Sequence, residues 1–215
     1  MSAQRGRAAL RPQRNPPPKQ GAEGDVREGS PHSCKRSDTQ KQLASKSSAH
    51  AVRIEGHAVS EGEVGRILLE FGTITLFDEI SSRKFSREEY LRILLEIAIC
   101  LEEVHSIGLS HLDLKPENLV LVDGRYKLCD FGSALEKPVR VDMLDKKGRS
   151  SLQDYLESNS TLIYRSPEMV MLERGEIGAA SDVWMMGCIA YFMHFRKHPF
   201  EGQGKLAIVS SLNYA

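Results

Sequence analysis

The sequence lacks three features that would each place it in a particular class of protein: paired cysteines, a long apolar run and an excess of one charge. The four cysteines stand far apart, at Cys34, Cys100, Cys129 and Cys188. They form no C-x-x-C pair, which argues against a zinc site or a disulfide framework and is typical of a reducing compartment such as the cytoplasm.

Two further classes are disfavoured by apolar runs and by charge. The longest apolar run, Val183 to Phe195, is interrupted by His194 and falls short of the ~20 residues that a membrane-spanning helix needs, so we expect no transmembrane segment. Lys plus Arg equals Asp plus Glu, at 29 each, so net charge predicts no binding to nucleic acid or to an anionic lipid surface.

Large apolar side chains are also scarce in residues 1–50, which are basic and rich in Pro and Ser. Such a segment cannot bury enough apolar surface to offset the entropy of ordering, so it is predicted to be a disordered tail. From Ala51 onward the composition is that of a globular protein. We therefore expect two parts, a tail over 1–50 and a folded region over 51–215.

The folded region begins with two strand-like runs, at 51–59 and 65–72, joined by the polar SEGE segment. This pattern predicts a small antiparallel pair. Ser86 and Glu89 then form a capping box ahead of a helix that runs from Tyr90 to His105 and ends before Gly108. Its apolar positions are expected at Leu91, Leu94, Leu95, Ala98 and Leu101.

The rest of the chain divides into one polar stretch and one apolar helix. Residues 136–160 are polar and are predicted to form a loop. Ser181 is predicted to cap a second helix with the sequence DVWMMGCIAYFM. Because this helix has no polar face, we expect it to lie inside a core.

The sequence HLDLKPENLVLVDGRYKLCDFGSA, from His111 to Ala134, contains most of a phosphoryl-transfer site. Transfer of a γ-phosphoryl group needs positioned charge: a base for the hydroxyl nucleophile and oxygen ligands for divalent cations. Asp113 and Asn118 lie five residues apart in one turn, and Asp130 opens a D-F-G sequence. The combined pattern is far more specific than D-F-G alone.

These motifs resemble those of the eukaryotic protein kinase family. The resemblance continues with S-P-E at Ser166 to Glu168 and with SDVWMMGC, and it covers residues 51–215. It implies an α+β fold of the protein-kinase type, present in part. Residues 51–80 would be a β remnant of the N-lobe with the hinge, and residues 81–215 the mostly helical first part of the C-lobe.

The resemblance also implies ATP and Mg²⁺ as cofactors and assigns roles to the motif residues. Asp113 would be the catalytic base and Lys115 would steady the γ-phosphate. Asn118 and Asp130 would be the magnesium ligands.

Further resemblance places the nucleotide base against the earlier strands. RILLEFGTITLF is similar to the fifth strand and hinge of a kinase. Leu69 would then be the gatekeeper, and Glu70, Phe71 and Gly72 would form the backbone that hydrogen-bonds adenine. Val120 would be the floor under the ring.

Lys115 and Thr161 resemble the serine/threonine class, which acts on Ser or Thr of protein substrates. Within it, LCDFGSA, TLIYRSPEMV and HPFEGQGKLAI most resemble the Numb-associated kinases, also called the actin-regulating or adaptor-associated group. That resemblance implies endocytic adaptor or actin-linked partners.

Departures from the family pattern set further expectations. Leu112 stands where most regulated kinases have Arg, so activity is expected not to depend on phosphorylation of the activation segment. Alternatively, Leu112 simply packs into the core. The resemblance pairs Glu168 with an Arg in C-lobe helices that would follow residue 215, so Glu168 is expected to have no visible partner.

No G-x-G-x-x-G turn and no VAIK-like lysine precede Ala51, so we expect a truncated domain that is inactive by itself. Three functions stay open. One is a serine/threonine kinase, and the alternative is a catalytically inactive, kinase-like binding or scaffold module. In the third, the basic tail binds acidic partners or a membrane and the kinase remnant is inert, although such a charge run is more often a solvated segment.

Overall fold

The computed structural model describes residues 50–60, 64–202 and 204–210, all of which belong to one compact unit. The predicted tail lies outside the described residues except for His50. His50 is part of the structure, because its carbonyl accepts a hydrogen bond from Leu128 N at 2.8 Å and its Nδ1 lies 2.7 Å from Glu103 Oε1.

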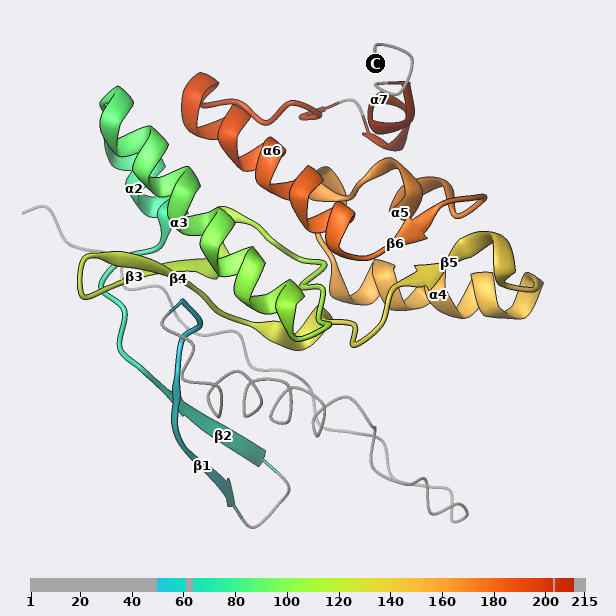
Figure 1. The fold of residues 1–215 in the computed structure, drawn as a ribbon, viewed down its shortest axis with the longest axis horizontal. Helices are drawn as coiled ribbons and strands as arrows, with labels where there is room; N and C mark the ends of the chain where they lie inside the picture. Colours follow the sequence, from blue (N-terminus) through green and yellow to red (C-terminus); the bar gives the residue numbers. More distant parts are fainter. Residues whose placement is uncertain (1–49, 61–63, 203, 211–215) are drawn as a thin grey trace, which may run out of the picture. The chain divides into compact units, whose positions relative to one another are not determined.

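Three two-stranded antiparallel sheets are present in the described residues (Figure 1). β1 (Ile54–Ser60) pairs with β2 (Val64–Leu69), which confirms the predicted pair, although its turn lies outside the described residues. β3 (Leu119–Val122) pairs with β4 (Arg125–Leu128) through Asp123 and Gly124. Both turn residues have positive φ, as a two-residue hairpin requires. The third pair is β5 (Val139–Arg140) with β6 (Glu176–Ile177).

The helix predicted after Ser86 is present as α3 (Arg87–Ser106). Ser86 Oγ accepts from Glu89 N at 3.1 Å and Glu89 Oε2 accepts from Ser86 N at 2.8 Å, so the predicted capping box is confirmed. α2 (Leu76–Ser82) precedes it.

The buried face of α3 matches the prediction only in part. Leu101 is buried as predicted, and Leu94 packs partly against the core. Leu91 and Leu95 are 54% and 61% exposed, whereas Ile93 and Ile97 are fully buried. α3 carries apolar side chains on more than one face, so the apolar periodicity of its sequence does not determine which face is buried. Packing against β4 and α6 determines it, and the buried residues are Ile93, Ile97, Cys100, Leu101 and Val104.

The prediction of a loop over 136–160 is wrong. This stretch contains β5, a 3-10 turn η3 (Val141–Met143) and the fourteen-residue helix α4 (Lys146–Asn159). Asp145 caps α4 by accepting from Gly148 N at 2.7 Å. Only Leu156 is fully buried, so the helix has too few apolar residues for a periodic signal.

The second predicted helix is α6 (Ala179–Phe195), which begins earlier than expected, with Gly178 as its N-cap. Ser181 lies in its first turn and accepts from Gly178 N at 3.5 Å. α6 is only partly buried, because Val183, Tyr191 and Phe195 are exposed. Although its side chains are nearly all apolar, α6 therefore has one face that no neighbouring element covers in the described residues.

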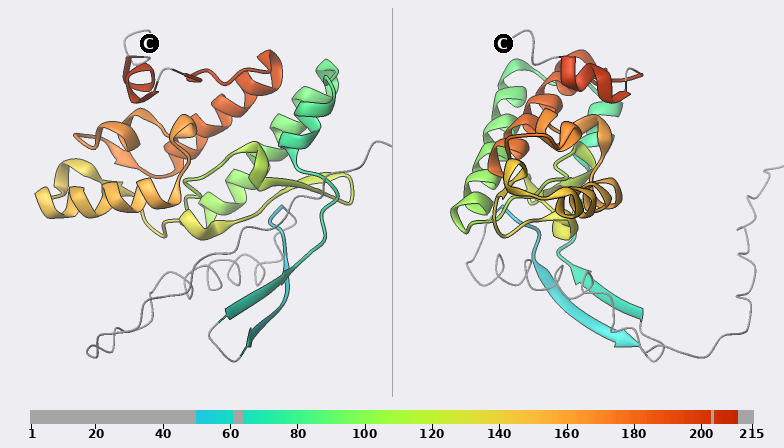
Figure 2. Two further views of the ribbon diagram at one scale, coloured as in Figure 1. Left: turned by 180° about the vertical axis from the view of Figure 1, so that it is seen from behind. Right: turned by 90° about the vertical axis from the view of Figure 1, so that its right-hand side faces the viewer.

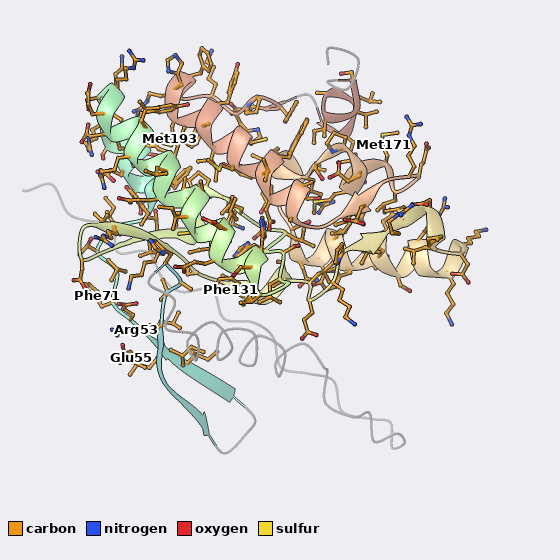
Figure 3. The ribbon with its side chains drawn as sticks, in the orientation of Figure 1. Arg53, Glu55, Phe71, Phe131, Met171 and Met193 are labelled. Atoms are coloured by element: carbon orange, nitrogen blue, oxygen red, sulfur yellow. The ribbon has the colours of Figure 1, made fainter. Side chains whose placement is uncertain are left out.

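The core includes the facing sides of α3 and α6, which pack against each other (Figures 1 and 2), and it continues through β3, β4 and the catalytic turn. Met193, labelled in Figure 3, is one of its buried members. No helix in the described residues is both long and apolar enough to cross a membrane. The remaining helical elements are η1 (Pro116–Asn118), η2 (Phe131–Ser133), η4 (Leu162–Tyr164), α5 (Pro167–Met171) and α7 (Gly204–Ser210).

Candidate active site

The turn that carries the candidate catalytic residues is held by Asp182, at the start of α6. Asp182 is fully buried, and its two carboxylate oxygens accept from His111 N and Leu112 N, each at 2.8 Å. His105 Nε2 lies 2.8 Å from the same carboxylate. Leu112 is fully buried with φ of 61°, a strained conformation for a non-glycine residue. The two bonds to Asp182 stabilise this backbone geometry.

Leu112 packs into the core, as the simpler of the two interpretations predicted. Independence from activation-segment phosphorylation stays a prediction.

The Asp113 carboxylate is held by Lys115 and Thr161, with a longer contact of 3.4 Å from Asn118 Nδ2 to Asp113 Oδ2. Lys115 Nζ donates to Asp113 Oδ2 at 2.7 Å. Asp113 Oδ1 accepts from both the backbone N and Oγ1 of Thr161, each at 2.8 Å. Lys115 Nζ also donates to Thr161 Oγ1 at 3.0 Å. The predicted base and the predicted phosphate-binding lysine are therefore in direct contact, with Asp113 only 7% exposed.

Asn118 and the segment before Asp130 are joined through the backbone. Asn118 is buried in η1, and its Nδ2 donates to Asp113 O at 2.9 Å. Cys129 N donates to Asn118 O at 2.9 Å, which brings the D-F-G turn beside the catalytic turn. Asp130 is exposed, has φ of 58°, and accepts from Gly132 N at 3.3 Å.

A second connection between the two motifs runs through His111. Its Nε2 lies 3.1 Å from Cys129 O, and its ring meets Phe131 edge-on with 5.0 Å between centroids. Burial, with the charge of Asp130 as a smaller contribution, raises the pKa of the Cys129 thiol to about 11. Cys129 therefore stays a neutral thiol at physiological pH.

The oxygen atoms of Asn118 and Asp130 fit the requirements of Mg²⁺. This ion prefers hard oxygen ligands and is usually held by one or two carboxylates together with substrate phosphates. Asn118 Nδ2 is used by Asp113, so the amide oxygen is the free ligand atom. In the described part of the chain, no group of three or more His, Cys, Asp or Glu could hold a metal by itself. The fit is therefore to an ion shared with phosphates.

Only some of the residues predicted to bind adenine lie in contact with one another. Thr73 N donates to Leu121 O at 2.9 Å, so the segment runs beside β3. Gly72 packs against Val120 so tightly that a Cβ at Gly72 would lie 1.9 Å from Val120 Cγ1. In contrast, Leu69 is 38% exposed and Phe71, labelled in Figure 3, is 83% exposed. The structure brings Gly72 and Val120 together, and the roles in adenine binding stay predictions.

Glu70 is anchored by charge. Its carboxylate accepts from Lys127 Nζ at 2.8 Å and lies 3.3 Å from Arg53 Nη2. Burial alone would raise the pKa of Glu70, but the hydrogen bonds and charges of Lys127 and Arg53 outweigh it and lower the pKa.

The expectation that Glu168 has no visible partner is wrong. Its Oε1 accepts a hydrogen bond from Ser181 Oγ at 2.9 Å, because α6 begins directly beside α5. The carboxylate is only partly buried, so a neutral hydroxyl satisfies it.

Sequence reasoning missed the anchoring role of Asp182 and the contacts of Thr161. Asp182 belongs to the SDVW motif, whose pattern predicts a helix but not a carboxylate that bonds to the catalytic turn. Thr161 is informative in the sequence only as a resemblance to the serine/threonine class. No local pattern shows that it contacts Asp113, which lies 48 residues earlier.

Comparison with known proteins agrees with this geometry. A protein kinase domain family model matches residues 30–213. A probable serine/threonine-protein kinase of Dictyostelium discoideum is 40% identical over 139 residues, covering 62% of this chain and 12% of that protein. Serine/threonine-protein kinase 16 of Mus musculus is 34% identical over 134 residues, covering 59% of this chain and 43% of that protein. The chain thus spans less than half the length of these relatives.

The fold also matches a solved structure. A chain of the yeast RNA Pol II CTD kinase CTDK-1 complex superposes with a TM-score of 0.67, over 87% of this chain and 58% of that chain. At 22% identity, this likeness shows a partial kinase fold. Because the family model covers most of the chain, the protein belongs to the protein kinase family.

Proposed function

We propose that this protein transfers the γ-phosphoryl group of ATP to a Ser or Thr hydroxyl of a protein substrate. The observation that carries the proposal is the Asp113 carboxylate, held by Lys115 and Thr161 at the end of a buried turn. Such a site needs little covalent chemistry from the protein and works mainly by positioning and charge.

The Asp113 carboxylate would accept a substrate hydroxyl where its present hydrogen bonds are longest. An ionised carboxylate offers about four acceptor positions. Oδ1 uses two of them for Thr161, and Oδ2 uses one for Lys115 at 2.7 Å and one for Asn118 Nδ2 at 3.4 Å. The substrate hydroxyl would take the position of the long Asn118 contact on Oδ2, which would orient the nucleophile. Lys115, beside it, would neutralise charge on the transferred group.

Asn118 and Asp130 would hold Mg²⁺ with their side-chain oxygens. When bound with ATP, the ion neutralises phosphate charge as the phosphoryl group leaves. The Asn118 amide is oriented for this by its bond to Asp113 O, so one turn would position both the base and a metal ligand.

Finer assignments rest on sequence similarity. We propose that the kinase belongs to the Numb-associated group, acts in the cytoplasm, and meets endocytic adaptor or actin-linked partners. The support is the run TLIYRSPEMV and the neighbouring motifs. A substrate screen with purified adaptor and actin-binding proteins would test the partner class.

The reaction is tested in the full-length protein, because residues 51–215 alone are expected to lack the turn and the lysine that hold the ATP phosphates. The assay follows transfer of the labelled γ-phosphoryl group of ATP, with Mg²⁺ present, to a Ser/Thr peptide library. Asp130→Ala should abolish turnover, whereas Asp142→Ala, which removes an exposed carboxylate outside the site, should leave it unchanged. Thermal unfolding of each variant checks folding. Retained turnover in Asp130→Ala would contradict the proposal. Absence of transfer by the wild-type protein would favour the alternative, a binding or scaffold module.

A further inference from the structure

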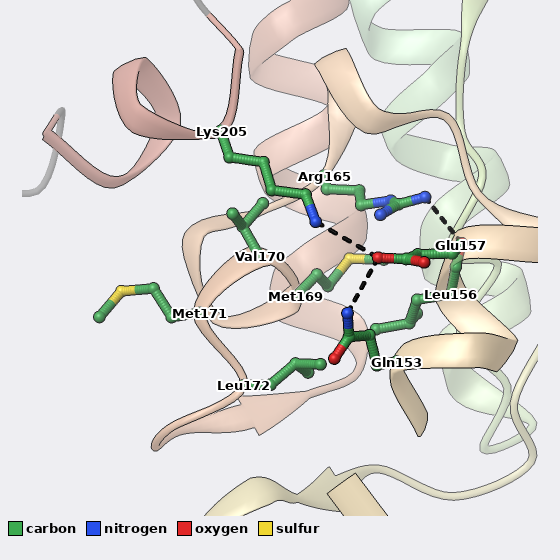
Figure 4. Close-up of a pocket in the computed structure, with 9 residues that line it drawn as sticks. All are labelled: Gln153, Leu156, Glu157, Arg165, Met169, Val170, Met171, Leu172 and Lys205. Atoms are coloured by element: carbon green, nitrogen blue, oxygen red, sulfur yellow. Dashed lines mark hydrogen bonds and ion pairs between the residues drawn. The ribbon is translucent and has the colours of Figure 1, made fainter. Parts of the chain in front are cut away.

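Arg165 is a buried cation at the junction of α4 and α5. It is 6% exposed, and its guanidinium makes three short hydrogen bonds. Nη2 donates to Leu156 O at 2.8 Å and to Ser160 O at 2.7 Å, and Nε donates to Ser160 Oγ at 2.9 Å. Figure 4 shows Arg165 with its bond to the end of α4. All three acceptors are neutral oxygen atoms from the last turn of α4 or the residue after it.

A buried guanidinium without a carboxylate partner is costly. None of the ion pairs among the described residues includes Arg165, and burial lowers its pKa, opposed by the more distant charges of Glu157 and Asp113. The end of α4 offsets part of this cost, because the last carbonyls of a helix lack partners and carry partial negative charge. A glycine could end the helix without burying a charge, so capping alone does not account for Arg165.

The hydrogen bonds of Arg165 lead directly to the candidate base. Ser160, which it holds at both the carbonyl and the hydroxyl, precedes Thr161 in the chain. The backbone N and Oγ1 of Thr161 are the two groups that donate to Asp113 Oδ1. A contiguous path therefore runs from Arg165 through Ser160 and Thr161 to Asp113.

We infer that Arg165 is a positioning residue: by fixing the end of α4, it holds Thr161 on Asp113 and so orients that carboxylate. The catalytic consequence rests on the proposed function, whereas the positioning itself does not. The helix α4 then has a defined role in the site, because its C-terminal end determines where Thr161 lies.

A matched control exists at the opposite end of the same helix. Arg149 is partly buried and, like Arg165, donates to a backbone carbonyl, from Nε to Leu144 O at 3.2 Å. It contacts neither Ser160 nor Thr161 in the described residues. Loss of either arginine would disturb α4, but only loss of Arg165 should release Thr161.

The first experiment measures amide hydrogen exchange at Ser160 and Thr161 in the protein without nucleotide. Arg165→Ala should speed exchange at both amides by about tenfold or more, while Arg149→Ala leaves them unchanged. Arg165→Lys, which keeps the charge with fewer donors, should give an intermediate rate and is the variant to use if Arg165→Ala does not fold. Unchanged protection in Arg165→Ala, or equal loss in Arg149→Ala, would overturn the inference.

The second experiment measures turnover and a double-mutant cycle. Arg165→Ala should lower kcat by about 10- to 100-fold with little change in the KM for ATP, since misplacement of a reacting group costs rate more than nucleotide binding. Combined with Thr161→Ala, its loss should be smaller than the product of the two single losses. Fully multiplicative losses would mean that Arg165 acts independently of Thr161. If the exchange result holds but the wild-type protein shows no turnover, the positioning stands and the proposed function fails.

Discussion

The catalytic turn and the predicted hinge differ sharply in how the described residues hold them. In the turn, His111, Leu112 and Leu114 are fully buried, and two backbone N–H groups are bound by one buried carboxylate. The hinge segment is held by the ion pair of Glu70, by backbone hydrogen bonds to Arg53 O and Leu121 O, and by the close contact of Gly72, while the side chains of Leu69 and Phe71 are exposed. The groups predicted to react are therefore preorganised by the core, whereas those predicted to face adenine lie at its edge.

The largest effect is expected from removing the anchor of the catalytic turn. Asp182→Ala leaves the N–H groups of His111 and Leu112 buried without acceptors and should lower the free energy of unfolding by about 3–5 kcal/mol. Urea unfolding measures the loss. Asp142→Ala, at an exposed ion pair, is the control and should change stability little. Equal losses in the two variants would contradict the stated difference between buried and exposed anchors.

A smaller effect is expected at the closest contact of the hinge. Gly72→Ala places a Cβ against Val120 Cγ1 and should cost roughly 1–3 kcal/mol of unfolding free energy. The double variant Gly72→Ala/Val120→Ala removes the clashing methyl group and should recover part of the loss. A stable Gly72→Ala variant, with no gain from the second substitution, would show that the hinge can move away from β3.

The smallest effect concerns the ion pair of Glu70 and Lys127. The pKa of Glu70 is lowered in the folded protein, so its stabilising contribution is present above its ordinary value of 4.5 and is lost as pH falls through the lower folded value. Lys127→Met should cost about 1 kcal/mol at neutral pH and flatten the pH dependence below 4.5. Thermal unfolding at several pH values measures both, with Lys137→Met as a surface control. If the stability of Lys127→Met depended on pH below 4.5 as strongly as that of the wild-type protein, the pKa of Glu70 would not be lowered by Lys127.

The sequence predicted those elements whose formation depends on residues close together in the chain. The capping box of Ser86 and Glu89 gave the start of α3, and two apolar runs gave the β1–β2 pair. The spacing of Asp113, Asn118 and Asp130 gave the candidate site, because those residues lie within one turn and the hairpin after it.

Features that depend on distant contacts were not predictable in the same way. α4 has one fully buried residue and a polar sequence, so its sequence has no apolar periodicity that would predict a helix. The contacts that hold the helix come from distant residues such as Arg165, which bonds to Leu156 O. Two of the apolar positions predicted for α3, Leu91 and Leu95, are exposed because packing against β4 and α6 buries a different row of apolar side chains. Thr161 reaches Asp113 only because the end of α4 is folded back toward the catalytic turn.

The bond between Leu112 and Asp182 also bears on how the protein is made. Asp182 follows Leu112 by 70 residues, so a ribosome completes the catalytic turn well before it produces the carboxylate that fixes that turn. At roughly 5–20 residues per second, the delay is about 4–14 seconds. During translation, the two hydrogen bonds that stabilise the strained backbone at Leu112 can form only after Asp182 has left the ribosomal exit tunnel.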